Sequence, residues 1–479
     1  MIVIDAEYVP HMDLNLNGNP LSEAIQVCLD RNVFVNEVIS KPNIQANFWS
    51  LPPFYQMTQL RQLTDVHQPL PQTWLMYHKI MSLVLHSYVK RDPFSPQMVR
   101  LKAKLAEQMR QDKVKFTHPV GLTTAPSVLV AGDSGTGKTT VIRTIQSRIP
   151  QVIHHCSYKG KHFANNQLVW VSFDLPPTGS AKAMAVNFFH AVDAALGTDY
   201  AEEWSARDRE SVDKHLTAMQ IVALEHNLGM VHVDELQFML AYSKNSNSPN
   251  LQILEALFNK IGVPIFQSCT AEGVDVFKAL PNGDYRVGTD TTTVRRMLND
   301  REYRLSNHEL SSTYFSELFD TLFPKALVHP ATPLIVRDSF KAKFHKLTCG
   351  LPAIMIRLAS LHHETFVNLL DSSSSNDGYH TYHEGLLEMV YRNQFSLIDP
   401  ALARYRRGDK SGYEKSIRTE SNKAAYSNKE VVEERKKVPR KKATVVKTEF
   451  PENQNLMLGV DSLLSKGEFL QGLEDDDNA

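Results

Sequence analysis

The stretch that decides the fold is Gly132-Asp133-Ser134-Gly135-Thr136-Gly137-Lys138-Thr139-Thr140. It satisfies the phosphate-binding pattern GxxxxGK[ST] at every fixed position, and all of its residues are candidates for nucleotide contact. Glycines let backbone N–H groups turn inward around phosphate oxygens, and the helix that follows directs its positive end at the same anion. We expect Lys138 to reach the β- and γ-phosphates and the Thr139 hydroxyl to bind Mg²⁺.

The flanking sequence suits a P-loop. Ser127–Ala131 reads SVLVA, an apolar run typical of a buried strand, and Thr140–Arg148 has the pattern of a helix. A glycine turn between a buried strand and a helix is the setting that this motif requires. We therefore predict a site for ATP and Mg²⁺, and a chance glycine turn is the alternative.

Two adjacent acids form a second candidate group. Asp234 and Glu235 follow the apolar run Gly229–Val233. Asp234 is a candidate to hold Mg²⁺, mainly through water, and Glu235 is a candidate to polarise an attacking water. Alone, such a pair is as typical of a solvated turn at a strand end, but the P-loop upstream favours the catalytic interpretation. We also expect another strand to lie between the P-loop strand and the strand that ends at Asp234.

The remaining patterns predict the fold class. Strand-like runs at Leu168–Phe173, Val263–Ser268 and Glu302–Leu305 alternate with helical stretches such as Ala181–Leu196. Helical patterns follow at Tyr314–Leu322, Val336–Leu347, Ala353–Asn368 and Tyr382–Tyr391. We therefore predict an α/β P-loop NTPase, with a parallel five-stranded sheet flanked by helices and then a small all-α domain.

Changes of pattern divide the chain into five parts. We place an acidic N-terminal segment at 1–45, a helical part at 46–120, the α/β core at 121–308, the α-helical domain at 309–400 and a tail at 401–479. Between residues 74 and 84 of the helical part, apolar side chains recur on one helix face.

Composition is that of an ordinary globular protein. Of 479 residues, 42% are hydrophobic and 22% charged. No apolar run approaches the roughly 18 residues of a membrane span, and the start lacks the basic region of a signal peptide. The four cysteines lie far apart without a CxxC pair, so neither a zinc site nor a disulfide framework is indicated. A reducing cytoplasm is the simplest setting.

Both ends carry charge that the formal net charge of −1 conceals. Residues 1–30 contain five acids and no Lys or Arg. Residues 401–450 carry 15 Lys or Arg against 7 Asp or Glu, whereas 451–479 carry 1 Lys against 7 acids. Such blocks are typical of solvated or disordered interaction tails. We predict that the tail is disordered and that both ends bind partners, with unstructured ends that have no partner as the alternative.

Four blocks together resemble one family. They read GDSGTGKTT at 132–140, LVWVSFDLPPTGSAKAM at 168–184, GMVHVDELQ at 229–237 and VPIFQSCTAEG at 263–273. Over residues 46–407 the chain is similar to the TnsC/TniB group of transposition regulators, which are AAA+ ATPases of Tns-type and related transposons. The similarity includes Asn47–Phe54 and Ile398–Arg407. TnsC is the first choice, because TniB and IstB-like relatives tend to be shorter.

The resemblance implies roles for further residues. Thr270 best matches the sensor-1 residue, although Cys269 stands where a glycine is common and leaves the register open by one residue. A strand-end cap is the alternative role for Thr270. Arg295 and Arg296 precede the fifth strand, where AAA+ proteins place an arginine finger that completes a neighbouring subunit's site. A surface basic pair is the alternative for these two.

The resemblance also implies an assembly on DNA. ATP-dependent heptameric rings, or filaments with a hexamer per helical turn, would form on double-stranded DNA, mark the target site and switch on the transposase. ATP would bridge Lys138 of one subunit and an arginine of the next. Hydrolysis would remove this bridge and allow disassembly.

The implied partners follow from the same resemblance. DNA contact would be mainly to phosphates, with Lys159, Lys161 and Lys182 as candidates and solvated lysines as the alternative. The transposase would bind the C-terminal tail, and a target-selection protein of the TniQ/TnsD type would bind the N-terminal segment. The setting would be the bacterial cytoplasm.

Two other functions compete with this interpretation. A replication-initiator-like or signalling AAA+ NTPase normally carries a winged-helix or sensor domain after the helical lid, and residues 408–479 are too polar for one. A nucleotide-dependent scaffold with little hydrolysis is the other. Lys138 and Glu235 are both present, so loss of hydrolysis is not evident. However, Ala353 occupies the place of the usual sensor-2 arginine, and Arg357, one helical turn later, is the candidate replacement.

Overall fold

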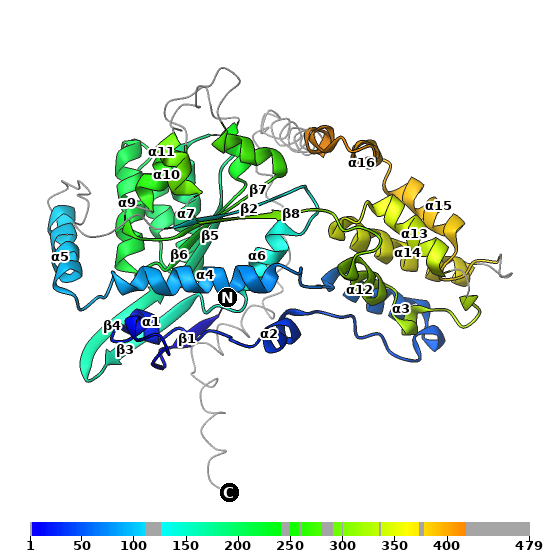
Figure 1. The fold of residues 1–479 in the computed structure, drawn as a ribbon, viewed down its shortest axis with the longest axis horizontal. Helices are drawn as coiled ribbons and strands as arrows, with labels where there is room; N and C mark the ends of the chain where they lie inside the picture. The colour runs from blue at the N-terminus through cyan, green and yellow to red at the C-terminus, as the bar shows by residue number, and fades with distance from the viewer. Residues whose placement is uncertain are drawn as a thin grey trace, which may run out of the picture. The chain divides into compact units, whose positions relative to one another are not determined.

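The computed structural model describes residues 2–110, 126–177, 179–240, 250–258, 261–278, 291–298, 300–334, 337–372 and 378–417. It contains a five-stranded sheet with helices on both faces, and a helical lid follows this core in sequence (Figure 1). The part of the predicted tail from residue 418 onward lies outside the described residues.

The central sheet is parallel throughout and has the strand order β5-β6-β7-β2-β8. Each strand lies within two residues of the run predicted for it, and β7 separates the P-loop strand β2 from β6, which ends at Asp234. The predicted intervening strand is therefore confirmed. The strands are β2 (Ser127–Gly132), β5 (Trp170–Asp174), β6 (Met230–Asp234), β7 (Ile265–Cys269) and β8 (Arg301–Leu305).

The sheet is covered on both faces, which explains why β2 is an unbroken apolar run. Val128 and Val130 pack in one core with α4 and α6, whereas Leu129 and Ala131 pack in another with α7 and α9. Figure 1 shows α7, α9, α10 and α11 on one face of the sheet and α4 and α6 on the other. The helices of the core are α4 (Thr73–Val89), α5 (Pro96–Arg110), α6 (Lys138–Gln146), α7 (Ala181–Leu196), α8 (Tyr200–Ala206), α9 (Val212–Glu225), α10 (Leu251–Leu257) and α11 (Thr291–Met297).

A second sheet, with the order β1-β3-β4, was not predicted. Its strand β1 (Val3–Asp5) runs parallel to β3 (Val152–Tyr158), and β3 forms an antiparallel hairpin with β4 (Lys161–Leu168). The strands β3 and β4 are rich in histidine and asparagine, and half of the residues of β4 are exposed. They lack the apolar alternation that marks a half-buried strand in a sequence.

The acidic N-terminal segment is part of the folded core. Leu21, Ile25 and Phe34 are fully buried, and the Phe34 ring stacks on that of Tyr77 in α4 with centroids 4.6 Å apart. The alternative of an unstructured N-terminal tail is therefore wrong for the described residues 2–45, and partner binding by this segment stays a prediction. The helices of this segment are α1 (Pro20–Glu23) and α2 (Arg31–Val38), and α3 (Pro53–Leu60) follows it.

The lid confirms the predicted run of helices after the core and extends further than predicted. The sequence analysis assigns residues 401–417 to a disordered tail, but 401–406 lie in helix α16 and 410–417 form a further helix. Buried Leu402, Tyr405 and Tyr413 anchor this otherwise polar segment, so that assignment is wrong here. The lid helices are α12 (Thr313–Leu322), α13 (Arg337–Thr348), α14 (Pro352–Ser372), α15 (Glu384–Gln394) and α16 (Asp399–Arg406).

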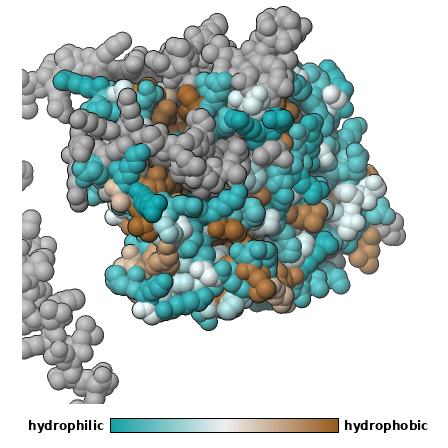
Figure 2. Space-filling model, turned by 60° about the vertical axis from the view of Figure 1, so that its left-hand side comes forward, coloured by the Kyte–Doolittle hydropathy of each residue, from teal (hydrophilic) through white to brown (hydrophobic). Residues whose placement is uncertain are grey.

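Large apolar side chains of the described residues lie mainly inside the protein. None of the described helices combines the length and apolarity needed to cross a membrane. On the face drawn in Figure 2, hydrophobic residues are scattered among hydrophilic ones. Most large apolar side chains lie instead in the two cores on either side of the central sheet.

Two adjacent histidines are buried in the lid helix α14. The Nε2 atom of His362 lies 2.8 Å from the Thr381 carbonyl oxygen, and that of His363 lies 3.0 Å from the Leu322 carbonyl oxygen. Each Nε2 therefore donates a proton to a backbone acceptor. Burial lowers the pKa of His362 to about 4 and that of His363 to about 3, so both imidazoles are neutral near pH 7.

We expect the protein to lose stability as the pH falls from about 6.5 towards 4. In this range His362 and His363 bind a proton in the unfolded chain, whereas in the folded protein they stay neutral. Each of the two histidines should lower the free energy of unfolding by about 1.4 kcal/mol per pH unit in this window, and should have no effect above it. A His363→Gln variant keeps a donor near the Leu322 carbonyl oxygen and removes one titrating group. Its melting temperature, measured against pH, should fall less steeply than that of the wild type. Equal slopes would contradict this assignment.

Candidate nucleotide site

The P-loop connects β2 to α6 by a tight turn. Gly135 and Gly137 have φ values of +86° and +91°, in the left-handed region that glycine reaches without strain. The Thr136 hydroxyl and backbone N–H both donate to the Asp133 carbonyl oxygen, at 2.7 and 3.2 Å. At Gly132 a Cβ atom would stand 2.6 Å from the Leu305 carbonyl oxygen, so β8 leaves room only for glycine. The turn is thus fixed by local hydrogen bonds and by the neighbouring strand.

Lys138 lies inside this turn. Its Nζ donates to the carbonyl oxygens of Gly132 at 2.7 Å and Asp133 at 3.1 Å. Burial lowers its pKa, while the negative charges of Glu414, Asp234 and Glu235 act in the opposite direction. The ammonium is therefore held on the loop among several acids, within reach of an anion that binds there.

Asp234 meets Thr139 at the carboxyl edge of the sheet. The Thr139 hydroxyl donates to Asp234 Oδ2 at 3.2 Å, although the two residues are 95 positions apart in the sequence. Asp234 ends β6, and Thr139 lies in the first turn of α6. A hydroxyl and a carboxylate oxygen side by side are ligands that Mg²⁺ accepts. The structure therefore brings together the two residues that the sequence analysis assigns to the metal.

Glu235 has a strained backbone. Its φ of +60° is unusual for a residue other than glycine. The backbone N–H of Glu235 donates to Asp234 Oδ1 at 2.8 Å, and the Gln237 amide donates to the Glu235 carboxylate. Strain of this kind, which costs of order 1–3 kcal/mol, is concentrated at functional sites. Here it sets the two neighbouring carboxylates into different surroundings.

A buried polar chain supports Asp234 from behind. The Ser268 hydroxyl on β7 donates to Asp234 Oδ1, and His232 Nε2 lies 2.9 Å from the same hydroxyl oxygen. His232 Nδ1 lies 2.7 Å from the hydroxyl oxygen of Ser172 on β5. Burial lowers the pKa of His232 to about 4, so its imidazole is neutral near pH 7.

The proton positions in this chain follow from hydrogen-bond counting. The one hydroxyl proton of Ser268 goes to Asp234, so His232 must donate from Nε2 to the Ser268 oxygen. A neutral imidazole with its proton on Nε2 accepts at Nδ1, and the Ser172 hydroxyl supplies that bond. Sequence reasoning missed these residues, although the polar His232 and Ser268 within the apolar runs of the fully buried strands β6 and β7 were a visible signal.

The candidate sensor-1 residue lies at the end of β7. Thr270 is buried, and its backbone N–H donates to the Gln237 side-chain oxygen at 3.1 Å. Gln237 also donates to Glu235, so one amide connects Thr270 to the acidic pair. Ser268, two residues earlier, makes the direct contact with Asp234.

The two candidate finger arginines differ in their surroundings. Arg296 Nη1 forms an ion pair with buried Glu255 Oε1 at 2.7 Å, which ties it to α10 of the same chain. Arg295 is exposed on α11. The Arg296 side chain is 43% exposed but is held by this ion pair, so the geometry favours Arg295 for reaching another subunit.

The lid approaches the P-loop without an arginine. The Ala353 backbone N–H donates to the Gly135 carbonyl oxygen at 3.3 Å, at the start of α14. Arg357 donates to the Gln394 carbonyl oxygen at 3.1 Å and lies over the Phe395 ring. The proposed replacement for sensor 2 is therefore engaged with the end of α15.

Residues after α15 contact the P-loop, which the sequence did not indicate. The Tyr405 hydroxyl donates to Asp133 Oδ2 at 2.8 Å, and the Tyr413 hydroxyl donates to the Ser134 carbonyl oxygen at 2.9 Å. Glu414 accepts hydrogen bonds from both the N–H and the hydroxyl of Ser134. More than 270 positions separate these partners, so no local pattern could have revealed them.

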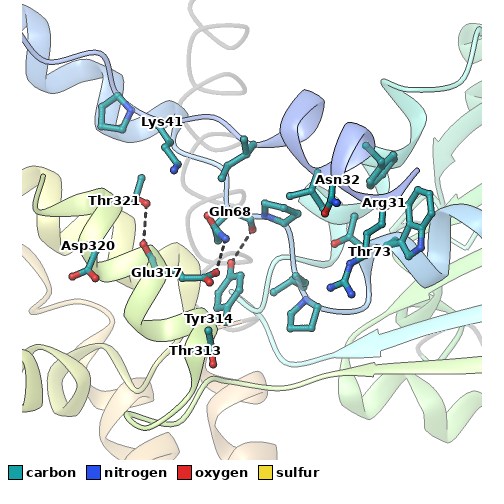
Figure 3. Close-up of a pocket in the computed structure, with 18 of the residues that line it drawn as sticks. Arg31, Asn32, Lys41, Gln68, Thr73, Thr313, Tyr314, Glu317, Asp320 and Thr321 are labelled. Atoms are coloured by element: carbon teal, nitrogen blue, oxygen red, sulfur yellow. Dashed lines mark hydrogen bonds between the residues drawn. The ribbon is translucent and has the colours of Figure 1, made fainter. Parts of the chain in front are cut away.

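The described residues line two cavities of different size. One of about 450 Å³ borders the loop and is lined by Asp133, Lys410 and Glu414 among others. A larger one of about 790 Å³ lies between α2, the segment before α4, and α12, where Gln68 bonds to Glu317 and Tyr314 (Figure 3). No P-loop residue lines the larger cavity. Asp133 of the P-loop lines the smaller cavity, whereas Lys138, Thr139 and Asp234 line neither of the two.

The three candidate DNA contacts all have partners within the chain. Lys159 pairs with Glu23 at 3.3 Å, and Lys161 lies over the Phe94 ring at 5.4 Å. Lys182 Nζ donates to the backbone carbonyl oxygen of Asp208. These contacts do not bring the three lysines into one cluster, and their role in DNA binding stays a prediction.

A known protein family matches the part of the chain that contains this site. Residues 122–274, which contain the P-loop, the acidic pair and Thr270, match a family model described as an AAA domain. This part of the chain is similar to an AAA domain. This observation, with the parallel sheet, confirms the predicted fold class. The TnsC/TniB assignment stays a prediction, and no curated protein matches the chain.

Three of the solved structures that match the chain are 12% or 13% identical to it. The Walker-type ATPase PABY2304 of Pyrococcus abyssi is 12% identical over 64% of this chain and 75% of that one, with a TM-score of 0.33. Cdc6p of Pyrobaculum aerophilum is 13% identical over 67% and 79%, with a TM-score of 0.31. The FIGL-1 AAA domain is 12% identical over 66% and 87%, with a TM-score of 0.27.

We expect a Ser268→Ala variant to need more Mg²⁺ for nucleotide turnover, because Asp234 loses the donor that orients it. A hydrogen bond to a charged group contributes about 1.5–3 kcal/mol, so half-saturation should rise about tenfold or more. Turnover and nucleotide binding are measured against Mg²⁺ concentration, with binding in EDTA as the reference. Ser172→Ala, at the far end of the polar chain, should have a smaller effect. An unchanged Mg²⁺ requirement in Ser268→Ala would contradict the role.

Proposed function

We propose that the chain binds ATP with Mg²⁺ at its P-loop and hydrolyses it, and that this reaction controls assembly on double-stranded DNA in a transposition regulator of the TnsC/TniB type. The observation that carries the enzymatic part is the 3.2 Å contact between Thr139 and Asp234 beside Lys138 and Glu235. The Lys138 ammonium, the Thr139 hydroxyl and the carboxylates of Asp234 and Glu235 come together at one edge of the sheet, and this supports the proposed binding of phosphate and metal.

The residues divide the chemical work. The loop N–H groups and Lys138 bind the phosphates, and Lys138 exchanges the Gly132 and Asp133 carbonyl oxygens for phosphate oxygens. Thr139 and Asp234 would hold Mg²⁺, which when bound neutralises charge on the β- and γ-phosphates. Glu235 orients the attacking water and accepts its proton, and Gln237 fixes the carboxylate for this task.

The finer part of the proposal depends on sequence. The blocks HVDELQ at 232–237 and LPPTGSAK at 175–182 resemble TnsC/TniB proteins. An exposed Arg295 suits a site completed by a neighbouring subunit, and such a site needs a homo-oligomer, as rings or filaments on DNA provide. The transposase, a target-selection protein of the TniQ/TnsD type and duplex DNA are the partners that this family resemblance suggests.

We expect a Glu235→Gln variant to assemble on duplex DNA with ATP and to stay there. Loss of the general base should slow hydrolysis about a hundredfold or more, while nucleotide binding persists. Electron microscopy and a DNA retention assay compare wild type and variant with ATP, a non-hydrolysable analogue and ADP. Equal DNA binding with and without nucleotide would contradict the switch, and normal hydrolysis by the variant would contradict the role of Glu235.

We expect Arg295→Ala to bind nucleotide normally and to hydrolyse it slowly, because the missing guanidinium acts on the neighbouring subunit's site. Lys138→Ala lacks a working P-loop but keeps Arg295. Mixing the two inactive variants should therefore restore part of the ATPase activity, which either one alone lacks. Arg296→Ala is the matched control and should lower the melting temperature through loss of the Glu255 ion pair. A mixture without activity would rule Arg295 out as the finger.

A further inference from the structure

Glu414 is buried against the P-loop. It lies in the helix at 410–417, it is only 1% exposed, and both of its carboxylate oxygens bind the same residue. The Ser134 N–H donates to Oε1 at 2.5 Å, and the Ser134 hydroxyl donates to Oε2 at 2.8 Å. A carboxylate thus occupies donors of the loop that the sequence assigns to phosphate.

Other side chains hold this helix on the loop. The Tyr413 hydroxyl donates to the Ser134 carbonyl oxygen, and the Tyr405 hydroxyl donates to Asp133 Oδ2. The rings of these two tyrosines pack edge to face with centroids 4.9 Å apart. Lys410 Nζ lies 3.4 Å from Asp133 Oδ2. Several independent contacts besides those of Glu414 therefore hold the 410–417 helix against the P-loop.

The negative charge of Glu414 raises the pKa of Lys138. After burial, which lowers the pKa of Lys138, the largest influence is the negative charge of Glu414, ahead of Asp234 and Glu235. A triphosphate at the same loop would add further negative charge in a buried setting. Like charges brought together away from water repel strongly. The carboxylate and the phosphates therefore compete for one positively polarised cradle.

We propose that Glu414 is an internal competitor of the nucleotide, and that phosphate binding displaces it from Ser134 and releases the 410–417 helix from the P-loop. This inference rests on the proposed nucleotide binding and adds its regulation. The chain continues from this helix into the C-terminal segment for which we predict a partner. Displacement of the helix would make that segment respond to nucleotide.

The decisive variant is Glu414→Gln, which keeps the shape of the side chain and removes its charge. Titration of the full-length protein with a fluorescent ATP analogue and Mg²⁺ should show about tenfold tighter binding, since a closed competing state weakens apparent affinity in proportion to its population. Glu202→Gln, an exposed change on α8, is the matched control and should bind like the wild type. Tyr413→Phe loosens the helix without touching the carboxylate and should tighten binding about threefold, by the same relation.

The outcomes separate this inference from the proposed function. Unchanged or weaker binding by Glu414→Gln, with binding by the wild type and none by Lys138→Ala, would overturn the competitor and leave the nucleotide site standing. No binding by any of these proteins would overturn both. Hydrogen exchange on the wild type provides a test without substitution. Amides of residues 410–417 should exchange faster when Mg·ATP is added, and greater protection would overturn the inference.

Discussion

The contact between the Thr139 hydroxyl and the Asp234 carboxylate is the constraint on which the site depends. It exists because β2 and β6 run parallel with only β7 between them, so their carboxyl ends open at the same edge of the sheet. Ligand sites of open parallel sheets lie at this edge, where the following loops and helix N-termini converge. The two apolar cores on either face hold the strands in this order, and a shift of β6 by one residue would turn Asp234 away from α6.

Holding a carboxylate in this place has an energetic cost. Asp234 is buried, and a buried charge is tolerated only where hydrogen bonds compensate for lost water. Ser268, His232 and Ser172 supply that compensation as a chain that crosses three strands. Such a network is stable only while every member is satisfied, and a neutral His232 satisfies its neighbours with one donor and one acceptor. The site therefore extends well behind the residues that would touch nucleotide.

The sequence allowed prediction of those parts of the site that are local in the chain. A glycine-rich turn needs a few consecutive residues, and buried parallel strands are continuous apolar runs, so the P-loop, Asp234 and the five central strands were all visible. The β1-β3-β4 sheet was not, because its strands are polar and its first pairing joins Val3 to Val152. Nor could the sequence distinguish Arg295 from Arg296, since only packing shows that Glu255 captures one of them.

The lid contacts show how far this protein departs from the usual charge arrangement. Where a sensor-2 arginine would bring positive charge to the phosphates, Ala353 offers only a backbone N–H to Gly135, and Arg357 is engaged elsewhere. The lid segment places Lys410 and two tyrosines on Asp133 and the Ser134 carbonyl oxygen, but the side chain that occupies the Ser134 N–H and hydroxyl is a carboxylate, Glu414. A positive lid residue favours closure on nucleotide, whereas a negative one favours closure without it. Because the two closures cannot coexist at Ser134, this lid opposes the ligand that its own P-loop is built to hold.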